Sequence, residues 1–93
     1  MTEAAHPATI LVVEDDKALR GDIVEELQEA GYRTAAAADG RDALDLLAHT
    51  TPDLLLCDIT MPGLDGYDVL KALRGRHPEL GTTPFVFLTA LSD

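Results

Sequence analysis

Short apolar runs alternate with amphipathic segments along this chain. The runs at residues 10–13, 32–38, 54–57 and 84–88 predict four strands. The run at 10–13 is short and entirely apolar, which is typical of a strand buried in a parallel sheet. Pro84 is compatible with the last strand because proline is tolerated at a first strand position.

The first amphipathic segment, residues 16–30, predicts a helix. Leu19, Ile23 and Leu27 recur every four residues, and acidic side chains occupy its other faces. Asp16 is the expected N-cap, and Gly31 suits the left-handed position that often follows a helix.

Two further segments predict helices. One opens at Asp39-Gly40 and ends before Pro52. The other begins after Asp65, a candidate N-cap, with Asp68 favouring the positive end of the helix dipole. We expect this third helix to end at Gly75 and Pro78 and to face inward through Val69, Leu70 and Leu73.

The order of elements is β-α-β-α-β-α-β, which predicts an α/β fold with a parallel sheet and helices on its faces. In such sheets, ligands bind beyond the carboxyl ends of the strands. The first strand ends at Glu14-Asp15-Asp16, the third at Asp58 and the fourth at Thr89. We therefore expect acidic groups and a hydroxyl to meet at one rim.

Composition narrows the classes of function. The 93 residues suit one small domain, and 17 acidic against 7 basic residues give a net charge of −10, which opposes nucleic-acid binding. We expect most of these carboxylates on solvated helix faces. No apolar run approaches the roughly 20 residues of a membrane span, and the N-terminus lacks a secretory pattern. A soluble cytoplasmic protein with a flexible segment at 1–8 is expected.

Sulfur and imidazole groups offer no evident site. Cys57 is the sole cysteine, so no intrachain disulfide can form, and its apolar surroundings predict a buried, inert thiol. His6, His49 and His77 show no metal-ligand spacing.

The clustered carboxylates at the rim need a compensating charge, because like charges raise one another's pKa. A hard cation supplies it, and oxygen-only ligands favour Mg²⁺ or Mn²⁺ over Zn²⁺. Such an ion commonly acts on phosphate oxygens, and a neighbouring carboxylate can itself be the nucleophile. The simpler alternative for Glu14-Asp15-Asp16 is a strand end that leads into a helix N-cap.

Three motifs in order resemble those of bacterial response-regulator receiver domains. Val12-Val13-Glu14-Asp15-Asp16 is similar to the family's acidic-pair motif, and Asp58-Ile59-Thr60-Met61-Pro62-Gly63-Leu64-Asp65-Gly66 to its phosphoacceptor loop. Leu88-Thr89-Ala90 resembles its Thr/Ser switch motif. The resemblance extends from Ile10 to Ala90 and implies a doubly wound, flavodoxin-like sheet with strand order 2-1-3-4 and three helices.

The resemblance also implies roles for individual residues. Asp58 would accept the phosphoryl group, while Asp15 would bind Mg²⁺ directly and Glu14 through water. The backbone carbonyl of Thr60 would complete the protein ligands. Thr89 would contact a phosphoryl oxygen and act as the switch. The implied donor is a sensor histidine kinase or a histidine phosphotransfer protein.

The chain departs from the family at its C-terminal end. A complete receiver continues through a fifth strand that ends in a phosphoryl-contacting lysine, and neither Lys17 nor Lys71 matches that position. Residues 9–93 are therefore expected to be an incomplete receiver whose exposed fourth strand favours self-association. It could be a fragment, a chain completed by strand exchange with a second copy, or a receiver-like module that binds partners without phosphorylation.

A Mg²⁺-dependent phosphohydrolase is the rival enzyme class. Haloacid-dehalogenase-like enzymes need a second aspartate two residues after the nucleophile, and that position holds Thr60. A nucleotide-binding module is disfavoured because no P-loop or Gly-x-Gly-x-x-Gly turn follows the first strand. The sequence thus predicts a signalling phosphoacceptor and no turnover enzyme.

Overall fold

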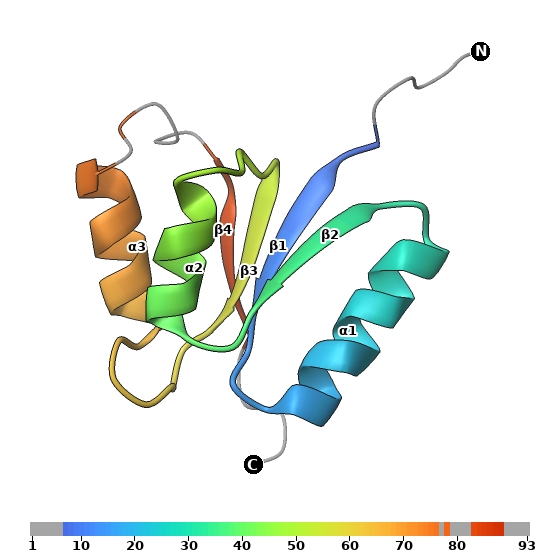
Figure 1. Cartoon of the computed structure of the whole chain (residues 1–93), viewed down its shortest axis with the longest axis horizontal. Helices are drawn as coiled ribbons and strands as arrows, with labels where there is room; N and C mark the ends of the chain where they lie inside the picture. Colours follow the sequence, from blue (N-terminus) through green and yellow to red (C-terminus); the bar gives the residue numbers. More distant parts are fainter. Residues whose placement is uncertain (1–6, 77, 79–82, 89–93) are drawn as a thin grey trace.

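A computed structural model describes residues 7–76, 78 and 83–88 of the chain, and these build a four-stranded parallel sheet flanked by helices (Figure 1). The strand order is β2-β1-β3-β4, as the family resemblance implied. The strands are β1 (Thr9–Val13), β2 (Arg33–Ala37), β3 (Leu54–Asp58) and β4 (Phe85–Leu88). The helices are α1 (Lys17–Glu29), α2 (Gly40–Leu47) and α3 (Gly66–Arg76). The predicted fold class is confirmed.

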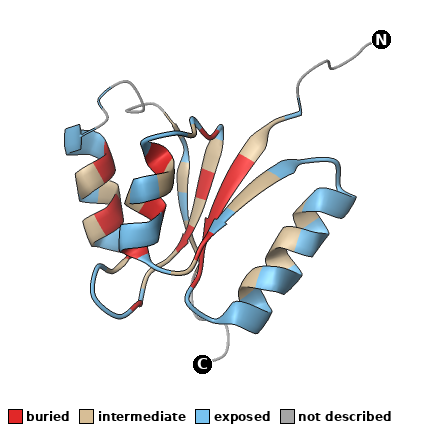
Figure 2. Ribbon diagram, viewed as in Figure 1, coloured by how far each residue is buried: buried red, intermediate tan, exposed pale blue. Residues whose placement is uncertain are grey.

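Alternation along the strands divides the apolar side chains between the two faces of the sheet. On the face covered by α2 and α3, buried residues form the hydrophobic core (Figure 2). The core residues come from the strands, from α2 and α3, and from the loop after β3. They are Leu11, Val13, Ala37, Ala43, Leu47, Leu55, Cys57, Met61, Val69 and Leu73. The central strands β1 and β3 contribute four of these ten residues. β1 is buried on both faces, as predicted, whereas β3 is buried only at alternate positions.

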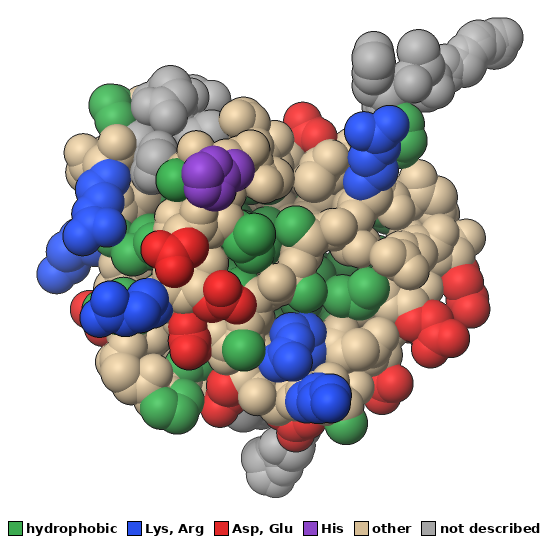
Figure 3. Space-filling model, viewed as in Figure 1, with side chains coloured by type: hydrophobic (Ala, Val, Ile, Leu, Met, Phe, Trp, Pro, Cys, Tyr) green, Lys and Arg blue, Asp and Glu red, His purple; other side chains and the backbone are tan. Residues whose placement is uncertain are grey.

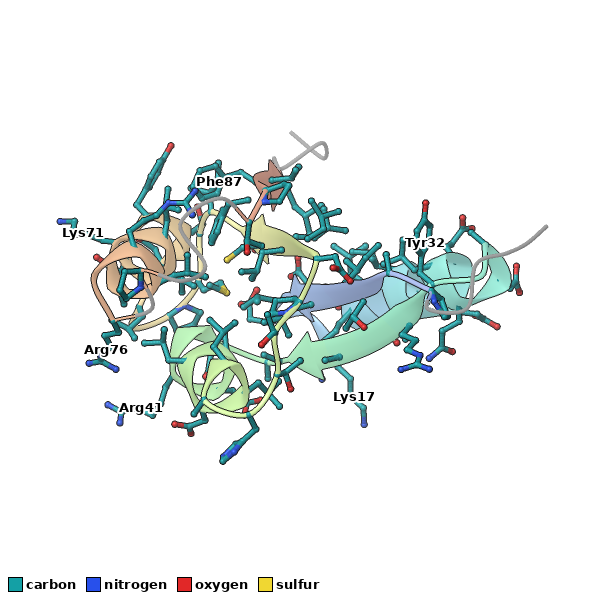
Figure 4. All side chains as sticks on the ribbon, turned by 90° about the horizontal axis from the view of Figure 1, so that it is seen from above. Lys17, Tyr32, Arg41, Lys71, Arg76 and Phe87 are labelled. Carbon is teal, nitrogen blue, oxygen red and sulfur yellow. The ribbon has the colours of Figure 1, made fainter. Side chains whose placement is uncertain are left out.

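The α1 face of the sheet is covered more thinly. Figure 4 shows α1 on the side opposite α2 and α3, above β1 and β2. Every residue of α1 is half-buried or exposed, and the Leu19 residue is 46% exposed to solvent. The amphipathic pattern groups Leu19 with Ile23 and Leu27, but Leu19 is exposed whereas Ile23 and Leu27 are half-buried.

Several predicted boundaries shift by a residue or two. Asp58 forms the last position of β3, one residue beyond the apolar run at 54–57 that predicted this strand. Gly75 does not end α3, which continues to Arg76. Asp58 pairs with Leu88 of β4 in the parallel ladder, which extends β3 by one residue.

Glycine supports the predicted end of α1. Gly31 adopts a φ of +100°, a conformation that costs glycine little because it lacks a Cβ atom. Its N–H donates to the carbonyl oxygen of Gln28 (3.0 Å). Within the described part of the chain, no helix is both long enough and apolar enough to cross a membrane.

Candidate metal and phosphoryl-transfer site

The carboxyl ends of β1 and β3 lie side by side at one rim of the sheet. Val13 pairs with Cys57 in the parallel ladder, so the residues that follow each of them emerge together. One carboxylate oxygen from each of Glu14, Asp15 and Asp58 lies within 4.8 Å of the others. Acidic groups far apart in the sequence are thus brought into one cluster, as the rim rule predicted.

The three carboxylates differ in burial. Glu14 is 4% exposed, Asp58 is half-buried and Asp15 is exposed. The Glu14 side chain accepts a hydrogen bond from the N–H of Asp16 (3.0 Å), and its own N–H donates to the carbonyl oxygen of Ala37 (3.1 Å). The cluster therefore has a fixed, buried acid at its base and an accessible acid at its edge.

Electrostatics oppose three ionised acids at this distance. Burial raises the pKa of Glu14 above its ordinary value of 4.5, and the negative charges of Asp58 and Asp15 raise this pKa further. The hydrogen bond from the Asp16 amide opposes the rise only in part. A cation between the three carboxylates would offset their mutual repulsion, and an all-carboxylate donor set fits Mg²⁺ or Mn²⁺.

The raised pKa of Glu14 predicts a pH dependence of stability. The folded state binds the Glu14 proton more tightly than the unfolded chain does. Protonation of Glu14 therefore stabilises the fold, and this contribution is complete below pH 4.5. This contribution is lost as pH rises from 4.5 through the raised folded pKa. In metal-free buffer we expect Glu14→Gln to melt at a higher temperature than the unmodified chain at neutral pH. Thermal unfolding across this range, with Glu25→Gln on exposed α1 as control, checks it; parallel curves for Glu14→Gln and the unmodified chain would contradict it.

The start of α1 lies directly beside the cluster. Asp16 is its N-cap, as predicted, and its Oδ1 accepts the N–H of Leu19 (3.0 Å). One turn further, Arg20 donates from Nη1 to the carbonyl oxygen of Glu14 (2.8 Å). Sequence reasoning did not identify Arg20, because an arginine in a helix carries no motif of its own.

Comparisons with known proteins agree with this fold. Residues 10–93 match the response regulator receiver domain family. The response regulator MprA of Mycolicibacterium vanbaalenii is 44% identical over 84 residues, which cover 90% of this chain and 35% of that protein. The DNA-binding transcriptional regulator NtrC of Escherichia coli K12 is 42% identical over 84 residues, which cover 90% of this chain and 17% of that protein.

Solved structures give the same result. CheY4, a chemotaxis protein of Vibrio cholerae, superposes with a TM-score of 0.86 at 33% identity, covering 94% of this chain and 72% of that one. TrrA of Thermotoga maritima, solved in complex with Mg²⁺-BeF, superposes with a TM-score of 0.79 at 36% identity, covering 91% and 71%. This chain belongs to the response regulator receiver family. It spans about a third of the length of MprA and a smaller share of NtrC.

The loop that follows Asp58 in this receiver is shaped by a glycine and a capping pair. Gly63 has a φ of +78°, in the left-handed region. Asp65 Oδ1 accepts the N–H of Asp68 (2.9 Å), and Asp68 Oδ2 accepts the N–H of Asp65 (3.1 Å). This reciprocal capping confirms the predicted start of α3. It fixes the backbone at the end of the loop that connects Asp58 to α3.

Other predicted site residues have different outcomes. Thr60 lies two residues beyond Asp58 in the same loop and is exposed. Thr89 and the neighbouring Ala90 lie outside the described residues, so the predicted role of Thr89 stays a prediction. Lys17 and Lys71 both point outward from the ribbon (Figure 4), which agrees with their exclusion as substitutes for the family's lysine.

Cys57 precedes Asp58 but cannot compete with it as a nucleophile. Its side chain is fully buried, and Sγ donates to the carbonyl oxygen of Asp58 (3.3 Å). Burial raises the pKa of the thiol to about 12, and the charges of Asp58 and Glu14 add to the rise. The thiol therefore stays protonated at neutral pH, as the sequence predicted for an inert cysteine.

Proposed function

We propose that this receiver domain accepts a phosphoryl group on Asp58 in a Mg²⁺-dependent reaction. The observation that carries the proposal is the convergence of Asp58 with Glu14 and Asp15 within 4.8 Å at the carboxyl rim of the sheet. A lone exposed aspartate would have no means of binding the metal that phosphoryl transfer requires. The Mg²⁺-BeF complex of the similar TrrA receiver supports the same chemistry here.

The proposed donor is the phosphohistidine of a sensor histidine kinase or a histidine phosphotransfer protein. One carboxylate oxygen of Asp58 would attack phosphorus, forming a P–O bond as the P–N bond of the donor breaks. The imidazole would leave with the electron pair of that bond. The product is an aspartyl phosphate, a mixed anhydride formed without a further co-reactant.

Other residues would hold the reacting groups in place. Asp15 would bind the metal directly, Glu14 through water, and Thr60 through its backbone carbonyl. Mg²⁺ bound there would neutralise charge on the transferring phosphoryl oxygens. Thr89 would contact the phosphoryl group and transmit its presence to a partner-binding surface.

Partner binding is the output that we propose for this domain. Acidic side chains gather over α1 and α2 on the face shown in Figure 3, and the net charge of the chain is −10. This surface disfavours contact with nucleic acid. We propose that the domain acts on other proteins.

Intact mass after incubation with acetyl phosphate tests the proposed function. In the presence of Mg²⁺ we expect a gain of one phosphoryl group per chain, and with EDTA no gain. A chain that binds Mg²⁺ yet gains no mass would contradict phosphoacceptance and support the binding-only module. Multiple turnover of a small phosphomonoester would instead support the phosphohydrolase.

We also propose that this 93-residue chain self-associates through β4. Among the described strands β4 pairs with β3 alone, and its Val86 is 45% exposed. An apolar edge strand can pair with a second copy, and a lysine there opposes such pairing. We expect dimers in sedimentation velocity that Val86→Lys reduces severalfold and Leu19→Lys, at a position 46% exposed on α1, leaves unchanged. A monodisperse monomer of the unmodified chain with a cooperative, high-temperature melt would contradict this.

A further inference from the structure

Arg20 forms the direct hydrogen bond between the body of α1 and the acidic cluster. Its Nη1 donates to the backbone carbonyl oxygen of Glu14 at 2.8 Å, across six positions of sequence. Its backbone N–H donates to the carbonyl oxygen of the N-cap Asp16, also at 2.8 Å. The backbone from which the Arg20 side chain extends is therefore fixed by the first turn of the helix.

Glu14 is held from three directions. A sheet hydrogen bond from its N–H to Ala37 fixes the backbone on one side, and the guanidinium of Arg20 fixes its carbonyl on the other. The amide of Asp16 holds its carboxylate. Of these three contacts, only the one from Arg20 connects Glu14 to a residue within helix α1.

Apolar packing does little to position the start of α1. Every α1 residue is half-buried or exposed (Figure 2), and Leu19, next to Arg20, is 46% exposed. A charge-assisted hydrogen bond is stronger and more directional than such contacts. The link from Arg20 to Glu14 therefore has a large share in fixing the angle between β1 and α1, and Asp15 lies within that angle.

We propose that Arg20 is a positioning residue for the metal site. It holds the β1–α1 junction so that the carboxylates of Glu14 and Asp15 face Asp58. This inference rests on the proposed Mg²⁺ site, and it adds a residue that contacts neither the metal nor the phosphoryl group.

Charge alone would predict the opposite effect of losing Arg20. The guanidinium is positive and lies beside the cluster, so its removal would strengthen the attraction of the acids for Mg²⁺. Loss of positioning weakens Mg²⁺ binding instead, because the acids no longer converge. The sign of the change in affinity therefore separates the two effects.

The test is Mg²⁺ binding by isothermal titration calorimetry on the full 93-residue chain. We expect Arg20→Met to weaken binding about tenfold, the loss typical when an outer-shell partner of a metal ligand is removed. Arg20→Lys retains the positive charge and N–H donors, and we expect it to bind Mg²⁺ with most of the affinity of the unmodified chain. Arg76→Met removes the same charge from the last turn of α3, and we expect it to leave binding unchanged.

Arg20→Gln is a second neutral variant in case Arg20→Met does not fold. Its amide is too short to reach Glu14 from the same backbone position, so we expect the same weakening. Equal or tighter Mg²⁺ binding in a folded Arg20→Met or Arg20→Gln chain would overturn the proposal, as would failure of Arg20→Lys to recover affinity. Absence of Mg²⁺ binding by the unmodified chain would contradict the proposed function instead, so the two failures are distinguishable.

Discussion

Replacing Asp58 with asparagine is expected to abolish phosphoryl transfer to the chain and to stabilise the metal-free protein. The amide has nearly the same shape as the carboxylate, so the fold should persist. It lacks the anionic oxygen that would attack phosphorus in the proposed reaction, and loss of a covalent nucleophile typically costs at least roughly 10³-fold in rate. Intact mass after incubation with acetyl phosphate and Mg²⁺ measures this loss.

The stabilising effect follows from the same cluster. The charge of Asp58 is one of the causes that raise the pKa of Glu14, and the two acids repel each other without a metal. Asp58→Asn removes that repulsion, so its melting temperature in EDTA should exceed that of the unmodified chain. Asp45→Asn, on the exposed surface of α2, makes the same change of charge and should alter neither property. Residual labelling of Asp58→Asn would show that another residue is the nucleophile.

Replacing Gly66 with alanine is expected to destabilise the domain strongly and to distort the loop that follows Asp58. A Cβ atom at Gly66 would lie 2.5 Å from the carbonyl oxygen of Asp58 and 3.0 Å from both Ile59 Cα and Phe87 Cε1. Two of these atoms belong to the backbone, and the N–H of Gly66 donates to the carbonyl oxygen of Ile59 (2.8 Å). The contact therefore cannot be relieved by rotating a side chain.

We expect Gly66→Ala to lower the free energy of unfolding by about 2–3 kcal/mol, at the upper end of overpacking. For a domain of this size that corresponds to a fall of roughly 10–20 °C in melting temperature. Phosphoryl uptake should fall as well, because relief of the clash displaces the carbonyl of Asp58 itself. Circular dichroism melts and intact mass measure the two effects.

Gly21 offers a matched control for this substitution. It also lies in a helix, but a Cβ atom there would have nothing within 4 Å. Gly21→Ala should therefore stabilise the chain by about 0.5–1 kcal/mol through helix propensity. A similar change in the free energy of unfolding for Gly66→Ala and Gly21→Ala would show that the close backbone contacts at Gly66 do not require glycine there.

Much of the architecture could be predicted because its signals are local. Apolar runs located β1 and β3, and their order with the helices predicted a parallel sheet whose carboxyl ends share one rim. Side chains that cap helices were recognisable in the same way, and Asp16 and Asp65 act as predicted. Glu14, Asp15 and Asp58 could be assigned to one site from topology alone, before any distance was known.

Other features depend on how elements far apart in the sequence meet. Periodicity shows which face of α1 is apolar but not how much sheet lies beneath it, so the exposure of Leu19 was not predictable. The requirement for glycine at Gly66 arises because the start of α3 passes against the end of β3 and the ring of Phe87. The sequence around Gly66 does not predict that either of these segments lies against it.

The sequence by itself therefore determined the elements, their order and the rim at which the acids would collect, because short-range patterning encodes each of them. Only the tertiary structure decided that the three carboxylates lie within 4.8 Å, that Glu14 is buried among them, and that Arg20 holds its carbonyl. These depend on the register of β1 with β3 and on the contact of α1 with the end of β1. Hydrogen bonds made only in the folded chain set both, and no local sequence pattern encodes them.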